Sequence, residues 1–197
     1  MSEVAICNRA LLLLGASPIT SFNENTNEGR LCRDHYDDIR DALLEAREWR
    51  FATDRRQLIP VTQTLAGMRP TLPSEVAFQA PHDCLRILNL ARVPVSVWDA
   101  DDVEYVQEGK IIYAKAPQVA ARYIFRQEAV GMFSPLFTEA LITRVAAEFA
   151  MALTGSQGKM KELYELAQNK LNVADIANSK VGHEPRPEGT LAPAGRR

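Results

Sequence analysis

The sequence predicts an α+β protein that is mainly α: an antiparallel bundle of about four helices, an inserted small antiparallel β-sheet or hairpin region, and an extended C-terminal tail. Three observations support this prediction. Helical apolar periodicity occupies both ends of the chain, prolines and alternating residues occupy the middle, and proline and glycine dominate the last stretch. We place the boundaries at 1–56 for the N-terminal helical pair, 57–130 for the β-rich region, 131–179 for the C-terminal helical pair and 180–197 for the flexible tail.

Two helices are predicted in the first region. Residues 3–14 carry an apolar face, and Gly15 followed by Pro18 ends the helix. A polar loop rich in Asn, Thr and Glu follows, and its asparagines are suitable N-caps. The second helix is expected to run from Glu28 to about Thr53, because apolar residues continue at helical spacing through this stretch.

Part of the second helix, CRDHYDDIR, places three carboxylates and an imidazole close together. At about 100° per residue, His35 falls on the apolar side and most of the carboxylates fall on the opposite side. Only Asp38 is near enough to share a local site with His35, and one His and one Asp are too few ligands for a metal. We therefore interpret the acidic side as solvated or facing another subunit, with its charges balanced by interleaved arginines. The apolar side comprises Leu31, Cys32, His35, Ile39, Ala42, Leu43, Ala46 and Trp49.

The middle region is expected to form one antiparallel sheet of three to five strands. Prolines interrupt the chain repeatedly between residues 60 and 81, which excludes a long helix there. Glu108-Gly109 is a turn candidate between two short apolar runs, and a later stretch alternates apolar residues with arginine. The expected strands are residues 85–90, 103–107, 110–114 and 121–125.

Two more helices are predicted after the strands. Ser134 is a good N-cap, Pro135 suits the first helical position, and Gly155 is a C-terminal stop. Apolar residues cover almost the whole circumference of this third helix, so we expect it to be the most buried. A fourth helix is expected from about Lys159 to Asn178.

Composition and charge exclude several classes of protein. Apolar residues make up 46% of the chain and charged residues 24%, and the net charge of −2 provides no basic field for nucleic acid. We expect neither a signal peptide nor a membrane span, because the apolar runs are short and no basic region precedes the first. The three cysteines are widely spaced without a CxxC pattern, which is typical of buried free thiols in a reducing compartment.

No catalytic, cofactor or metal site is predicted. The chain has no Gly-rich phosphate loop and no GxSxG motif, and His35, His82 and His183 are scattered over a helix, a loop and the tail. Two alternatives stay open: carboxylates from separate segments could meet in a cleft and hydrolyse a glycan, or the first two helices could bind DNA. The DNA alternative requires a basic recognition helix, whereas residues 28–53 are acidic on balance.

Four stretches lie in an order and spacing that are similar to those of a known family: AICNRALLLLGASPITSFNENTNEGRLCRDHYDDIRDALLEAREWRFA, PHDCLRILNL, GKIIYAKAPQVAARYIFRQE and FSPLFTEALITRVAAEFAMALTGS. They resemble the tail tubular protein A family, the head-to-tail adaptors of short-tailed bacteriophages. The resemblance covers about residues 3–178 and rests on order rather than on a single motif. Arg47-Glu48 before Trp49 departs from the family, in which small residues or a His-Pro-like approach are common.

The resemblance implies a non-enzymatic structural protein of a phage or prophage particle. Such proteins form rings, commonly dodecameric, beneath the portal at the capsid vertex, and they carry the tail nozzle below. The implied partners are further copies of the chain, the portal, the nozzle and DNA that passes through without being read, with no cofactor and no membrane. The implied location is the neck of the virion and, before assembly, the host cytoplasm. The alternative is a tail-associated peptidoglycan hydrolase.

The resemblance also suggests where the contacts lie. In a ring, charged residues of the second helix are expected to pair with a neighbouring subunit; they are Asp34, Asp37, Asp41, Arg33, Arg40 and Arg47. The tail is expected to bind the portal, because its Pro and Gly content prevents a core of its own and it ends in two arginines. Its candidate portal-binding residues are Val181, Pro185, Pro187, Leu191, Arg196 and Arg197. Near-neutral charge suits a channel in which DNA slides.

Overall fold

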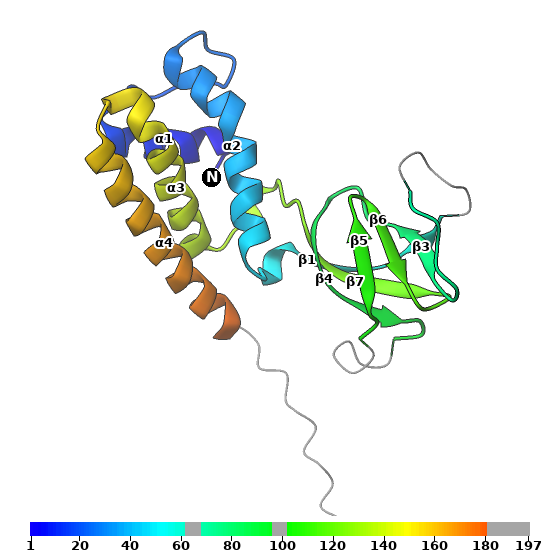
Figure 1. Cartoon of the computed structure of the whole chain (residues 1–197). Coiled ribbons are helices and arrows are strands. Elements are labelled where there is room, and N and C mark those ends of the chain that lie inside the picture. Colours follow the sequence, from blue (N-terminus) through cyan, green and yellow to red (C-terminus); the bar gives the residue numbers. More distant parts are fainter. Residues whose placement is uncertain (62–67, 96–101, 181–197) are drawn as a thin grey trace, which may run out of the picture.

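A computed structural model describes residues 1–61, 68–95 and 102–180, and within them the protein is a mixed α+β structure that is 49% helical. The helices gather on one side and the strands on the other (Figure 1). The elements are α1 (Glu3–Leu14), α2 (Asn27–Ala46), η1 (Arg50–Ala52), β1 (Thr53–Gln57), β2 (Ile59–Pro60), β3 (Val76–Gln79), β4 (Cys84–Arg92), β5 (Tyr105–Glu108), β6 (Ile111–Ala114), β7 (Val119–Phe125), η2 (Val130–Met132), α3 (Pro135–Thr154) and α4 (Gln157–Lys180).

The ends of α1 and α3 lie where the sequence predicts them. Ser134 Oγ accepts a hydrogen bond from the Phe137 N–H at 3.2 Å, and Pro135 occupies the first turn of α3. Gly15 and Gly155 follow α1 and α3 in the left-handed conformation, with φ of 71° and 64°. A residue with a Cβ adopts this conformation only at a cost, so glycine is the residue that ends these helices most readily.

The second helix is shorter than predicted: α2 ends at Ala46 rather than near Thr53. Arg47 is extended, with φ −142° and ψ 168°, and the chain then turns so that Trp49 folds back into the core. Trp49 Nε1 donates a hydrogen bond to the Leu43 carbonyl at 2.9 Å, so it satisfies an oxygen that the helix end leaves open. Helical periodicity continues past residue 46, but this tertiary contact overrides it and Thr53 begins β1.

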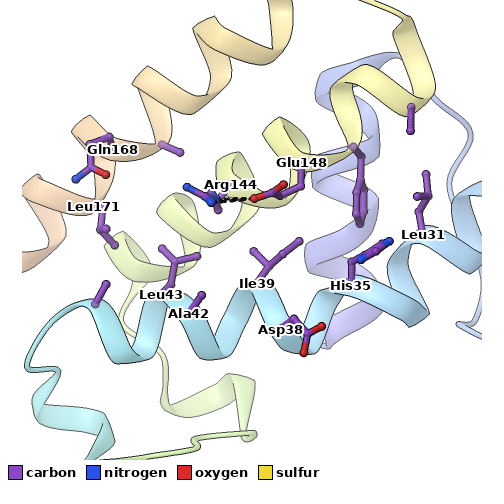
Figure 2. A pocket seen from close by; sticks show the side chains of 14 residues that line it. Leu31, His35, Asp38, Ile39, Ala42, Leu43, Arg144, Glu148, Gln168 and Leu171 are labelled. Atoms are coloured by element: carbon purple, nitrogen blue, oxygen red, sulfur yellow. Dashed lines mark hydrogen bonds and ion pairs between the residues drawn. The ribbon is translucent and has the colours of Figure 1, made fainter. Parts of the chain in front are cut away.

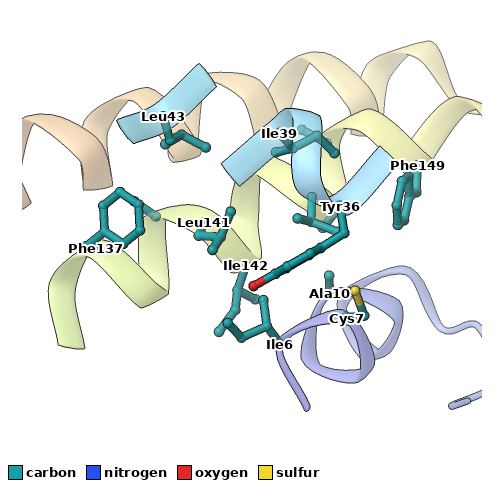
Figure 3. Close-up of a cluster of buried hydrophobic side chains, with 14 of the residues drawn as sticks. Ile6, Cys7, Ala10, Tyr36, Ile39, Leu43, Phe137, Leu141, Ile142 and Phe149 are labelled. Carbon is teal, nitrogen blue, oxygen red and sulfur yellow. The ribbon is translucent and has the colours of Figure 1, made fainter. Parts of the chain in front are cut away.

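The helix α3 lies at the centre of the helical part, in contact with α1, α2 and α4. Residues from all four helices form one hydrophobic core, and α3 supplies fully buried side chains on several faces, as predicted from its apolar circumference. Figure 3 shows Tyr36 of α2 reaching between Ile6 of α1 and Leu141 of α3. The helices at the two ends of the chain therefore share one core.

The strands form two antiparallel sheets, not the one sheet predicted. One has the order β1-β7-β4 and the other β2-β3-β6-β5. The β5–β6 hairpin, β4 and β7 lie within or close to the predicted segments, whereas β1, β2 and β3 lie outside them. A second hydrophobic core lies between the sheets and takes Leu90 and Tyr123 from one and Phe78 and Ile112 from the other.

Side chains on β7 join the strands to the helices. Ile124 is fully buried in the helical core, although its neighbour Tyr123 belongs to the core between the sheets. Alternation along β7 thus places successive residues in two different cores. Two ion pairs reinforce the junction: Arg122 with Glu48 at 3.3 Å and Arg126 with Asp41 at 2.5 Å.

An aromatic cluster at this junction is expected to contribute strongly to stability. Phe137 is fully buried, with its ring 5.0 Å from Trp49 and 5.1 Å from both Phe51 and Phe133. We predict that Phe137→Ala lowers the free energy of unfolding by about 3–5 kcal/mol, because it removes these contacts and leaves a cavity. Urea unfolding followed by circular dichroism measures the change. The matched control is Leu136→Ala one residue earlier, where the side chain is 40% exposed; a similar loss in both variants would contradict the prediction.

A charged network connects α1, α3 and α4. The carboxylate of Glu139 on α3 contacts Arg9 of α1 and lies 3.3 Å from Lys170 Nζ of α4. The hydrogen bond from Arg9 holds the pKa of Glu139 below its ordinary value, and the Lys170 ammonium acts in the same direction. The ionised form of Glu139 therefore stabilises the folded helices.

We predict that Glu139→Gln lowers the free energy of unfolding at neutral pH and has less effect in acid. Because the folded pKa is depressed, the contribution of Glu139 is complete above its ordinary pKa of 4.5 and disappears as the pH falls through the lower folded pKa. The effect is small because Glu139 is 39% exposed. Urea unfolding of both proteins at about pH 7 and about pH 3 checks it. An equal difference at the two pH values would contradict this assignment.

Candidate functional site

A groove between α2, α3 and α4 has a volume of about 570 Å³. Figure 2 shows His35, Ile39 and Leu43 pointing from α2 toward Arg144 and Glu148 on α3 and toward Leu171 on α4. The complete lining is Leu31, His35, Asp38, Ile39, Ala42, Leu43, Ala46, Arg144, Glu148, Phe149, Ala152, Ala167, Gln168 and Leu171.

Most of the predicted apolar side of α2 lines this groove, although Ile39 and Leu43 also belong to the helical core. His35, Ala42 and Ala46 are exposed. The side of α2 that is fully buried includes Tyr36 and Arg40. The helical wheel did not place these two residues on the apolar side. The wheel orders residues around a helix correctly, but it cannot show which part of an apolar side a neighbouring helix covers.

The polar groups in the groove are held by one another. Arg144 Nη2 lies 2.8 Å from Glu148 Oε1, the i, i+4 pair that the spacing allows, and its guanidinium lies 4.5 Å from the centre of the Tyr164 ring. His35 lies beside Phe149, with ring centres 6.4 Å apart. The groove therefore has an apolar floor crossed by one ion pair, an arrangement suited to binding rather than to proton transfer.

Two carboxylate pairs in the described part of the chain are candidates for acid–base chemistry: Glu3 with Asp37, and Asp38 with Glu148 in the groove lining. Among the described residues, no three His, Cys, Asp or Glu side chains are grouped to hold a metal ion. Glu3 and Asp37 lie near each other. Burial raises the pKa of Glu3, and the negative charge of Asp37 raises it further. Arg40 lies between them, 2.8 Å from Asp37 and 3.7 Å from Glu3, and neither carboxylate lines the groove. In the groove lining, the carboxylate that accompanies Asp38 is Glu148, which is paired with Arg144.

The predicted interface residues Arg40 and Asp41 are used within the chain. The Arg40 side chain is 3% exposed and lies 2.8 Å from both Asp37 and Asp41, and Asp41 also binds Arg126. A buried guanidinium offers almost no surface to another subunit. We therefore narrow the predicted interface to the members of the set that remain accessible.

Those accessible members lie at three places on α2 and its C-terminal end. Arg33 and Asp34 pair with each other at 3.0 Å and are 44% and 55% exposed. Asp37 is 70% exposed, and Arg47 pairs with Asp175 of α4 at 3.1 Å. Most of these charges pair with other residues of the same chain. Their contact with a neighbouring subunit stays a prediction.

The structure also identifies groove residues that the sequence analysis did not single out. Gln168 and Ala167 of α4 and Ala152 of α3 line the groove opposite α2. The sequence signal that could have identified the groove was the small residues, because alanines at facing positions of two helices leave room between them.

The candidate tail residues Val181, Pro185, Pro187, Leu191, Arg196 and Arg197 lie outside the described residues.

No model of a known protein family and no curated protein matches the chain. None of the described helices combines the length and the apolar character that crossing a membrane requires.

The buried position of Arg40 leads to a test of its structural role. We predict that Arg40→Ala lowers the free energy of unfolding by about 1–3 kcal/mol, because charged hydrogen bonds and the packing of its stem on α1 and α2 are lost. Arg33→Ala is the control on the same helix, and its expected effect is within about 0.5 kcal/mol. Chemical unfolding measures both. If Arg40→Ala costs no more than the control, the buried ion pairs do not stabilise the fold.

Proposed function

We propose that this protein is a head-to-tail adaptor of a phage or prophage particle: a ring component that joins the portal to the tail nozzle and lets DNA pass through. The observation that carries the proposal is the order of elements. Two helices, a compact pair of sheets and two further helices follow one another along the chain, and the outer helices pack together. This is the order that the resemblance to the tail tubular protein A family implies.

Exposed apolar side chains on the helices support association with further copies. Leu12 on α1 is 76% exposed, and Val173 and Ile176 on α4 are 55% and 58% exposed. Val173 and Ile176 lie three residues apart on one face of α4, and neighbouring exposed apolar side chains of this kind are typical of surfaces that another protein covers. In a ring, each copy would present one such surface to the next, and a heterologous contact of this kind closes when its rotation closes.

The remaining parts of the proposal concern the partners. The strands would face the nozzle, and residues 181–197 would contact the portal through the tail residues named above. A near-neutral chain would line a channel to which DNA binds weakly, since each cation that neutralises a phosphate adds binding. The protein would be in the host cytoplasm before assembly and would then act in the neck of the virion as a dodecameric ring.

We predict that the full chain mixed with the portal protein of the same genome forms rings, and that Asp34→Lys weakens them. Asp34 is a predicted interface residue with an exposed side chain, so charge reversal should act on contacts between copies and leave the fold intact. Negative-stain electron microscopy and size-exclusion chromatography detect the rings. Circular dichroism of the variant controls for folding, and Asp34→Asn controls for the size of the side chain.

Two outcomes would overturn these proposals separately. If no annular assembly forms with the portal, the adaptor function is wrong. If rings form equally well with Asp34→Lys at low and at high salt, the adaptor function stands but the charged contact on α2 does not. Turnover of a peptidoglycan substrate that is lost in an Asp38→Asn variant would favour the alternative hydrolase.

A further inference from the structure

The groove between α2, α3 and α4 leaves part of the helical core uncovered. Ile39 and Leu171 at its floor are 8% and 7% exposed, whereas Ala42 and Ala46 at its edge are exposed. Its volume of about 570 Å³ is ample for several side chains of another segment. An apolar floor of this size is more stable when an apolar group covers it, because covering removes the floor from water.

The edge of the groove on α2 is acidic. Asp38 lines the groove and Glu45 lies seven residues later on the same side of the helix, and neither has an ion-pair partner among the described residues. The one cation in the lining, Arg144, is already paired with Glu148. A segment that fills this groove should therefore combine apolar groups with positive charge.

The C-terminal end of α4 lies at one mouth of the groove. Asn178 Nδ2 donates a hydrogen bond to the Glu48 carbonyl at 2.8 Å, and the Arg50 N–H donates to Asn178 Oδ1 at 3.1 Å. These bonds fix the end of α4 beside the end of α2, next to Ala46 and Leu171 of the groove lining. The chain that continues after Lys180 therefore starts close to this mouth.

Residues 181–197 are long enough to enter the groove from that mouth. Fully extended, they span about 55 Å. At 1.5 Å per helical residue, the return from Lys180 to the level of Leu171 takes about 14 Å, and the passage along α2 from Ala46 to Asp34 takes about 18 Å. The available length thus exceeds the required path by roughly 20 Å, which leaves room for the initial turn.

The order of residues in this segment matches the order of groups in the groove. Its second half reads Leu-Ala-Pro-Ala-Gly-Arg-Arg from residue 191 to residue 197. A chain entering at Ala46 would meet the apolar floor before it reaches Asp38 in the lining and then Asp34, which is outside the lining and one helical turn from Asp38 on α2. Five extended residues separate Leu191 from Arg196, about 16 Å, and Leu43 and Asp34 are about 14 Å apart along the helix.

We propose that residues 181–197 fold back into the groove of their own chain, with Leu191 on the floor formed by Ile39, Leu43 and Leu171, and with Arg196 and Arg197 beside Asp38 and Asp34. This contact goes beyond the proposed function and does not require it. If the same segment also binds a portal, the two contacts compete, and the groove holds the tail until the portal displaces it.

The test measures the reactivity of a thiol placed in the groove of the full chain. Ala42→Cys introduces this thiol. The native Cys7 and Cys32 are fully buried and Cys84 is partly exposed, so the unaltered chain supplies the background rate, which is subtracted. We expect the introduced thiol to react slowly with a soluble disulfide reagent, and Leu191→Asp to accelerate the reaction by about tenfold or more, as release of a mostly bound segment would. Leu12→Cys on α1 is the control, with a rate that Leu191→Asp leaves unchanged.

A charge exchange separates the proposed contact from a general loosening of the protein. Reversal of both terminal arginines, Arg196→Glu with Arg197→Glu, should accelerate labelling at position 42, and addition of Asp38→Lys should slow it again. An unchanged labelling rate with Leu191→Asp would overturn the proposal. Protection that increases with protein concentration would also overturn it, because the groove would then hold the tail of a second copy. Neither readout uses portal binding, so the adaptor function is tested independently.

Discussion

The burial of α3 is the constraint on which the rest of this structure depends. This helix is apolar on most of its circumference, and a helix of that kind is stable only when other elements surround it. α1 and α2 come from the start of the chain and α4 from its end, so they cover α3 only if the strands between them return the chain to its starting point. The pairing of β1 with β7 makes this return, because it places Thr53 opposite Ile124.

Local signals were sufficient to predict the elements whose limits are set by neighbouring residues. Ser134, Pro135 and Gly155 define α3 because a cap, a fixed φ and a left-handed residue act within one turn of chain. The same kind of reasoning failed for the end of α2 and for β1 to β3. Trp49 ends α2 through a contact with the core, and the short strands exist because the second core gives them a partner. Neither partner is visible in a window of sequence.

The candidate site shows the same division between local and tertiary information. The alternation of Asp and Arg along α2 correctly indicated a charged helix, but it could not tell Arg33, which is exposed, from Arg40, which is buried. That difference arises because α1 covers one part of α2 and brings Glu3 to Arg40. Likewise, His35 lies on the apolar side of the helical wheel and yet is exposed, because it faces the groove between α2, α3 and α4.

The groove follows from the way the helices cover α3. α2 and α4 both contact α3, and where they face each other their side chains are small, with Ala42 and Ala46 on one helix and Ala167 on the other. Larger residues at these positions would close the gap and complete the core without another segment. Because these three residues are alanines, the groove stays open, and Ile39 and Leu171 keep 8% and 7% of their surface exposed. A single fold thus combines a complete core around most of α3 with one open side, and the acidic edge of that side favours a partner that carries positive charge.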